Sequence, residues 1–95
     1  MPVYLVANIT VKDAEKMEAY AAAAGPTLDA FGAEFIMEGH LADTLSGRWP
    51  VQGVALVRFP SIEAAQTWYH SADYQALKEL RSSAADMDIA LFEAA

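Results

Sequence analysis

The chain has 95 residues and no cysteine, which fits a single domain and excludes disulfides, zinc–thiolate sites and cysteine nucleophiles. Its formal net charge of −7 excludes the basic surface that nucleic acids and anionic membranes require. No apolar run approaches the length of a membrane span and no signal peptide is recognisable, so the sequence predicts a soluble, cytoplasmic protein.

The first half of the chain predicts a strand, a helix and a second strand. Residues 3–11 are rich in β-branched side chains and predict the first strand. Asp13 is a good N-cap for the helix, in which apolar residues recur at helical spacing. Gly25 and Pro26 interrupt this pattern, because proline lacks an N–H donor and clashes with the preceding turn. We therefore expect a kinked or two-piece helix, followed by a strand at residues 33–38.

The second half predicts two further strands and a divided helical segment. A long connection at residues 39–50 precedes the third strand at 52–59. Ser61 caps one helical piece and Ser71 caps a second. Residues 87–92 predict the fourth strand. The order is that of a ferredoxin-like βαββαβ fold of the α+β class, a single domain with a four-stranded antiparallel sheet and its helices on one face.

The predicted strands are apolar on both faces. In the first strand, one face carries Leu5, Ala7 and Ile9, and the other carries Tyr4, Val6 and Asn8. The third and fourth strands repeat this pattern, whereas an antiparallel sheet with a solvated face should carry polar residues there. The hydrophobic content of 55% is also high for one small core. The sequence therefore predicts a homodimer in which the uncovered face meets a second copy.

Several short segments stand out for their combination of aromatic, glycine and proline residues. They are Tyr4-Leu-Val-Ala-Asn-Ile9, Tyr20 with Ala24-Gly25-Pro26, Ser46-Gly47-Arg48-Trp49, Phe59-Pro60-Ser61, Trp68-Tyr69, Ser71, Tyr74-Gln-Ala-Leu77 and Arg81. In this combination the chain, over nearly its whole length, resembles the family catalogued as domain of unknown function thirteen-thirty, of the dimeric α+β-barrel superfamily.

The resemblance implies a dimer whose two sheets close into a barrel with the helices outside. Similar superfamily members include cofactor-independent monooxygenases, lactone isomerases and haem enzymes, commonly with pockets between helices and sheet. This spread implies no single activity. Family members often carry paired glycines where this chain has Gly39-His40, so no role for His40 follows from the resemblance.

Two histidines each precede an aspartate by three positions, in the pairs His40–Asp43 and His70–Asp73. Two ligands without a third do not make a metal site, so we expect no metal. The second pair is better explained by charges that suit the ends of helices. His40 is the candidate acid–base catalyst, because it lies in a connection and histidine titrates near neutral pH.

Aromatic residues near the second helical segment are candidate ligand contacts. Trp68, Tyr69 and Tyr74 would line a flat pocket between the helices and the sheet, with Trp49 closing over the ligand. The favoured alternative for Trp68 and Tyr69 is packing in the core, because aromatic residues at helical spacing are usually buried.

Arginine side chains are the candidates for binding an anionic group. Arg48 or Arg81 would attract a ligand carboxylate near the aromatic residues. Arg58 lies on a strand that is otherwise apolar on that face. It either binds a substrate carboxylate or, as the favoured alternative, pairs with Glu34 or Glu38.

Other polar residues give weaker indications of function. Asn8 either orients a substrate carbonyl or cross-links the dimer. No nucleophile elbow, glycine-rich phosphate loop or cofactor fingerprint is present, so we expect no tightly bound cofactor. Two functions remain open. One is the binding or transformation of a small, largely apolar or aromatic metabolite, and the other is a catalytically silent dimeric structural or interaction module.

Overall fold

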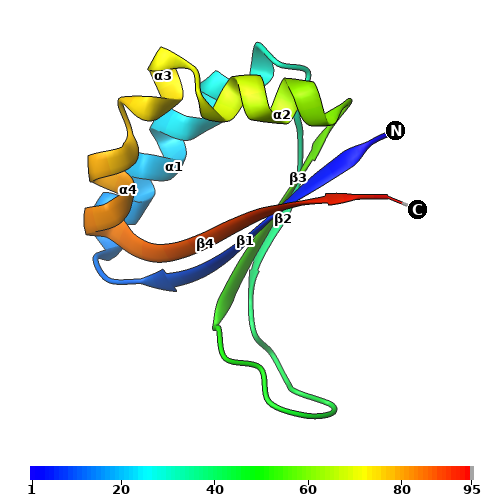
Figure 1. Ribbon diagram of the computed structural model, residues 1–95. Helices are drawn as coiled ribbons and strands as arrows, with labels where there is room; N and C mark the ends of the chain where they lie inside the picture. Colours follow the sequence, from blue (N-terminus) through cyan, green and yellow to red (C-terminus); the bar gives the residue numbers. More distant parts are fainter. Residues whose placement is uncertain (95) are drawn as a thin grey trace.

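The computed structural model describes residues 1–94 and places all helices on one side of a single curved sheet (Figure 1). The elements, in chain order, are β1 (Val3–Val11), α1 (Ala14–Asp29), β2 (Glu34–His40), β3 (Gly53–Phe59), α2 (Ile62–Tyr69), α3 (Ala72–Gln75), α4 (Lys78–Ala84) and β4 (Ala85–Glu93). The strands are antiparallel and lie in the order β2-β3-β1-β4. This is the predicted ferredoxin-like fold.

Side-chain caps begin three of the helices where the sequence predicts them. Asp13 Oδ1 accepts a hydrogen bond from the Lys16 amide at 3.0 Å and begins α1. Ser61 Oγ accepts from the Ala64 amide at 3.1 Å and begins α2, and Ser71 begins α3 in the same way. Each cap supplies a partner for an amide that the first helical turn leaves unpaired.

Helix α1 is a single helix, so the prediction of two helical pieces is wrong. It continues through Pro26 to Asp29. Pro26 has no N–H, so the carbonyl of Ala22 loses its hydrogen bond within the helix. Because Pro26 lies in the last turn, this loss falls close to the helix end, where the last carbonyls lack helical partners in any case. Proline in the last turn therefore weakens the helix without dividing it.

Replacing Pro26 by alanine should stabilise the protein. A proline ring in a helix interior costs about 3 kcal/mol, and in the last turn the cost is smaller, while the freer unfolded chain of the variant offsets about 1 kcal/mol of the gain. We expect the free energy of unfolding, measured in urea, to rise by about 1 kcal/mol. Pro50→Ala, in the exposed connection between β2 and β3, is the matched control and should not stabilise. A loss of stability in Pro26→Ala would contradict the placement of Pro26 within a helix.

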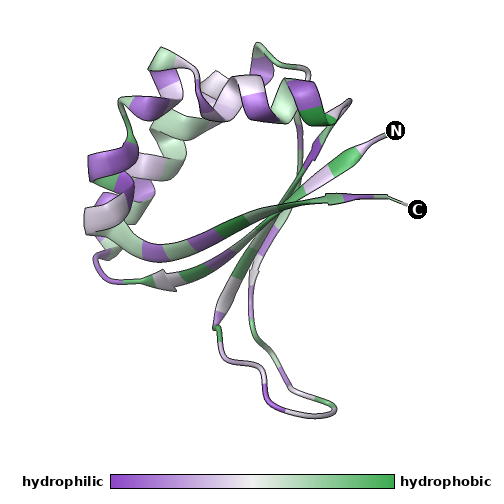
Figure 2. Ribbon diagram, in the orientation of Figure 1, coloured by the Kyte–Doolittle hydropathy of each residue, from purple (hydrophilic) through white to green (hydrophobic). Residues whose placement is uncertain are grey.

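The core lies between the helices and the inner face of the sheet, which is the face toward the helices. Val3, Leu5, Ala7 and Ile9 of β1 are buried on this face, together with Val57 and Phe59 of β3. The intervening residues of β1 are only half-buried, which confirms the predicted alternation. Figure 2 shows hydrophobic residues along the strands. Among residues 1–94 no helix has the length and apolar character needed to cross a bilayer.

The outer face of the sheet, which the helices leave uncovered, has an apolar row across all four strands. Cross-strand pairing aligns Met37 with Leu56, Leu56 with Val6, and Val6 with Ala90. Partners directly opposite in an antiparallel ladder point to the same face, so these side chains form one continuous stripe.

Candidate functional site

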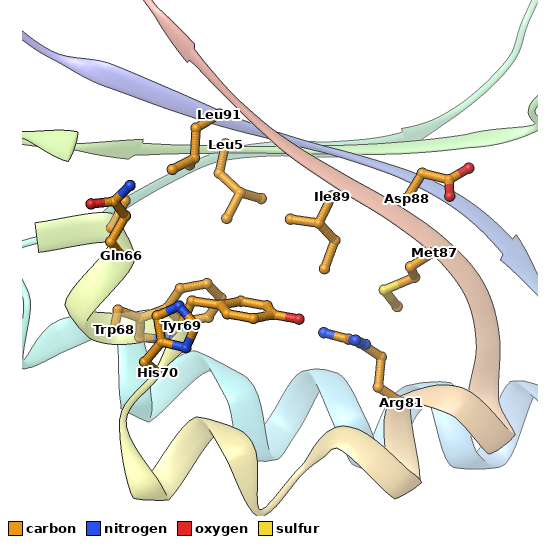
Figure 3. Close-up of a pocket in the computed structure, with 11 residues that line it drawn as sticks. Leu5, Gln66, Trp68, Tyr69, His70, Arg81, Met87, Asp88, Ile89 and Leu91 are labelled. Atoms are coloured by element: carbon orange, nitrogen blue, oxygen red, sulfur yellow. The ribbon is translucent and has the colours of Figure 1, made fainter. Parts of the chain in front are cut away.

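A cavity of about 390 Å³ lies between α2, α4 and β4 (Figure 3). Its helical lining consists of Ala65, Gln66, Trp68, Tyr69, His70 and Arg81. Its sheet lining consists of Leu5, Met87, Asp88, Ile89 and Leu91. The alternation of β4 directs Met87, Ile89 and Leu91 toward the helices, so the wall on the sheet side is mainly apolar.

Trp68 is a core residue whose polar atom is satisfied. Its ring centroid lies 4.2 Å from that of Tyr74 and 5.5 Å from that of Phe59. Its Nε1 donates to Thr27 Oγ1 at 2.9 Å, and that hydroxyl donates to the Ala24 carbonyl at 2.6 Å. The core alternative predicted for Trp68 is therefore correct, although one edge of the ring still lines the cavity.

A chain of hydrogen bonds connects the core to the cavity. The hydroxyls of Tyr20 and Tyr74, both buried, lie 2.7 Å apart, and Arg81 Nη1 donates to Tyr74 Oη at 2.8 Å. Burial raises the pKa of Tyr20, and the hydrogen bond with Tyr74 raises it further, so Tyr20 stays a neutral phenol at physiological pH. This series of hydrogen bonds therefore ends at the cavity with the Arg81 guanidinium, which is held by the Tyr74 phenol.

Arg81 is half-buried and keeps its charge. Burial alone would lower the pKa of its guanidinium, but the hydrogen bond to Tyr74 and the nearby Tyr69 phenol outweigh this effect and raise the pKa. Only the contact with Tyr74 has hydrogen-bond geometry, although the Tyr69 hydroxyl points toward the guanidinium (Figure 3). Arg81 Cζ lies 5.8 Å from the ring centroids of both tyrosines.

The structure brings together four of the predicted site residues. Trp68, Tyr69 and Arg81 line the cavity, and the fully buried Tyr74 lies behind them. Tyr69 remains half-buried at the cavity surface, so its predicted packing in the core is only partial.

The other residues of the predicted pocket lie elsewhere. His40 ends β2, at the edge of the sheet opposite β4. Arg48 and Trp49 are exposed in the connection at residues 41–52, which projects away from the helices (Figure 1). The predicted grouping of His40 and Trp49 with the aromatic residues is therefore wrong within one chain, because the strand order separates β2 from β4. A catalytic role for His40 stays a prediction.

Asn8 and Arg58 lie on the outer face and do not line the cavity. Arg58 is exposed and directly opposite Glu34 in the β2–β3 ladder, whereas Glu38 faces the helices. Within residues 1–94 the one ion pair formed is Lys12–Asp86, so Arg58 makes none with either glutamate. Exposure explains this difference from the prediction, because a solvated guanidinium does not need a paired charge.

The sequence analysis missed Gln66, His70 and the β4 residues as parts of this site. The spacing of four residues places Gln66 and His70 on one side of α2, and the His70 ring lies edge-on to Tyr69 with 5.3 Å between centroids. That spacing is a local signal that could have identified the pair. The contribution of β4 had no local signal, because it depends on β4 pairing with β1.

In the described part of the chain, residues 1–94, no group of three or more His, Asp or Glu side chains is arranged to hold a metal ion. His70 ends α2, where its amide donates to the Gln66 carbonyl, and Asp73 lies in the first turn of α3. Both residues therefore occupy the helix ends that the sequence analysis favoured over a metal site.

Solved structures with the same fold cover almost all of this chain. A protein of unknown function from Rhodopseudomonas palustris is 18% identical, with a TM-score of 0.83 over 99% of this chain and 82% of that one. SnoaB, a cofactor-independent oxygenase from Streptomyces nogalater, is 14% identical, with a TM-score of 0.72 over 99% and 93% of the two chains. A dimeric ferredoxin-like protein of unknown function from Jannaschia is also 14% identical, with a TM-score of 0.70 over 99% and 100%.

At these identities the likeness establishes the fold alone. No curated protein matches the chain. The sequence model of one family matches residues 2–95. The chain therefore belongs to the family described as domain of unknown function DUF1330.

Proposed function

We propose that the protein binds a small, largely apolar or aromatic metabolite in the cavity between α2, α4 and β4, without a tightly bound cofactor. The observation that carries this proposal is the cavity itself. Its volume of about 390 Å³ falls within the range of about 300–1,000 Å³ that is typical of small-molecule sites. An apolar wall, here the sheet side, that faces a few polar groups on the helical side is also characteristic of such sites.

The shape of the lining favours a flat ligand. The ring of Tyr69 lies on the helical side, facing Leu5 and Ile89 on the sheet side (Figure 3). Arg81 occupies one end of this space, and Gln66 and His70 occupy the other end. An aromatic body between the two walls would bury apolar surface on both faces while its substituents reached the polar ends.

Turnover of the ligand would be a second step after binding. The fold is shared with a cofactor-independent oxygenase, and the same fold supports unrelated activities. The proposal therefore concerns binding first. Chemistry without a tightly bound cofactor would be tested by incubating a bound compound with the protein in air and measuring products.

A cavity-blocking variant tests the proposal. Indole and 1-naphthol should bind the wild type with a Kd of about 1 mM or tighter, as judged by isothermal titration and NMR shifts. Gln66→Trp should abolish binding, because a large ring would fill the mouth of the cavity. Thr67→Trp is the matched control, since Thr67 is the exposed neighbour that does not line the cavity, and it should bind normally. No binding by the wild type would favour the silent structural module, whereas equal binding by both variants would place the ligand outside this cavity.

We also propose that two copies of the chain pair through the outer face of the sheet. The apolar row of Met37, Leu56, Val6 and Ala90 supports this, because no helix covers it. Phe92 and Met37 are 58% and 42% exposed. Exposed apolar side chains that lie together on one face are typical of a surface that a partner covers. Asn8, on the same face, could then hydrogen-bond across the dimer.

A further inference from the structure

We propose that the ligand of the cavity is an anion, and that Arg81 receives its carboxylate through paired N–H donors. This inference rests on the proposed function and names the chemical class of the ligand. It would make the natural ligand an aromatic or apolar acid, with its flat body between the walls and its carboxylate at the Arg81 end.

Arg81 lacks an acidic partner within residues 1–94. The one ion pair of residues 1–94 joins Lys12 to Asp86, so the guanidinium has no carboxylate within 4.0 Å. Asp88 lines the cavity, but its carboxylate points away from Arg81 (Figure 3). The chain has 13 acidic residues and only six basic ones, so partners for a purely structural arginine would be plentiful.

Arg81 is held in place by a buried tyrosine. A guanidinium has five N–H donors, and the hydrogen bond to Tyr74 uses one of them. Tyr74 is fully buried and is itself fixed by Tyr20 and by the ring of Trp68. The guanidinium is therefore anchored from behind by a rigid phenol, with further donors left for the cavity side. Such an arrangement suits bidentate recognition of a carboxylate.

Without a ligand, the guanidinium of Arg81 is partly desolvated. Arg81 is half-buried, so part of its hydration is lost without a compensating charge. Tyr20 cannot supply the charge as a phenolate, because burial raises its pKa. A ligand carboxylate would supply the missing negative charge. Its attraction to the guanidinium would be stronger here than in bulk water, because the site is partly shielded from solvent.

Matched pairs of probes separate this inference from the proposed function. 1-Naphthoate and 1-naphthamide have nearly the same shape, and only the first carries a charge. Wild type should bind the naphthoate about 10- to 100-fold more tightly than the amide, as expected for hydrogen bonds to charged groups. Arg81→Gln should lose this preference and keep its affinity for the amide. Lys78→Gln, an exposed change on the same helix with the same loss of charge, should keep the preference.

Each alternative result has a distinct meaning. Equal binding of the two probes by wild type would overturn the anion inference and leave the proposed function standing. Binding of neither probe would overturn both. A preference that survives in Arg81→Gln would place the anion elsewhere. If that variant does not fold, Arg81→Lys replaces it. A single ammonium cannot form the paired bonds, so its preference should be reduced at least about threefold. An unreduced preference would contradict paired recognition.

Discussion

Trp68→Ala should lower the free energy of unfolding by about 3–5 kcal/mol, the usual cost of removing a large buried aromatic ring. Trp68 is 4% exposed and packs against the rings of Phe59 and Tyr74. Small domains are stable by only about 5–15 kcal/mol, so the loss would use much of that margin. Urea denaturation followed by circular dichroism, at one fixed protein concentration, would measure it.

The second tryptophan of the chain provides the control. Trp49 is 60% exposed in the connection between β2 and β3, so Trp49→Ala should change the stability of the chain by no more than about 0.5 kcal/mol. Equal losses for the two alanine variants would contradict the difference in burial.

The hydrogen bond between Trp68 and Thr27 can be separated from the packing. Thr27→Val leaves the buried indole N–H without its acceptor and should cost about 1–3 kcal/mol. Trp68→Phe removes the donor as well as part of the ring. Because the two changes remove the same bond, the double variant should lose less stability than the sum of the single variants. Simple additivity would show that this bond contributes nothing.

The secondary structure was predictable because its signals are local. Asp13, Ser61 and Ser71 cap the helices that the sequence analysis placed after them. Pro26 was misinterpreted because the effect of a proline depends on where the helix ends. A proline in the middle of a helix would divide it, but α1 continues through Pro26 and ends three residues later. Helix length is decided by packing, which a local signal does not contain.

The candidate site was only partly predictable because its residues meet through the order of the strands. Trp68, Tyr69 and Tyr74 are close in the sequence, and their grouping was predicted correctly. Trp49, in the connection after β2, was expected to close over them, with His40 at the start of that connection as the catalyst. The order β2-β3-β1-β4 instead puts β2 and β4 at opposite edges of the sheet. The sheet side of the cavity therefore comes mainly from β4, whose apolar pattern the sequence analysis recognised only as part of a strand.

Light scattering at micromolar concentration should give twice the chain mass of 10.3 kDa for the wild type, and Leu56→Lys should reduce it to the monomer mass. Leu56 lies in the apolar row, between Met37 and Val6. In a two-fold interface every substitution occurs twice. Burying these ammonium groups without partners costs several kcal/mol, so we expect Kd to rise by a factor of about 100 or more.

A lysine on the opposite side of the molecule is the matched control. Ala19→Lys makes the same change of charge at an exposed position of α1 and should leave the dimer intact. A stable interface needs about 1,000 Å² of buried surface. The apolar contribution to that surface would come from the row and from its flanking residues Tyr4 and Phe92. If the wild type is a monomer, something else must cover the row. If Leu56→Lys remains a dimer, the chains pair through another surface.

The acidity of the chain predicts how the dimer should respond to ionic strength. Two copies of net charge −7 repel each other, so pairing is favoured where the contact carries few carboxylates. The row of Met37, Leu56, Val6 and Ala90 carries no charge, while the neighbouring rows of the same face hold Glu34 with Arg58 on one side and Asp88 on the other. Salt screens the repulsion but does not weaken burial of apolar surface. The dimer should therefore dissociate less as ionic strength rises, whereas a dimer joined by ion pairs would dissociate more.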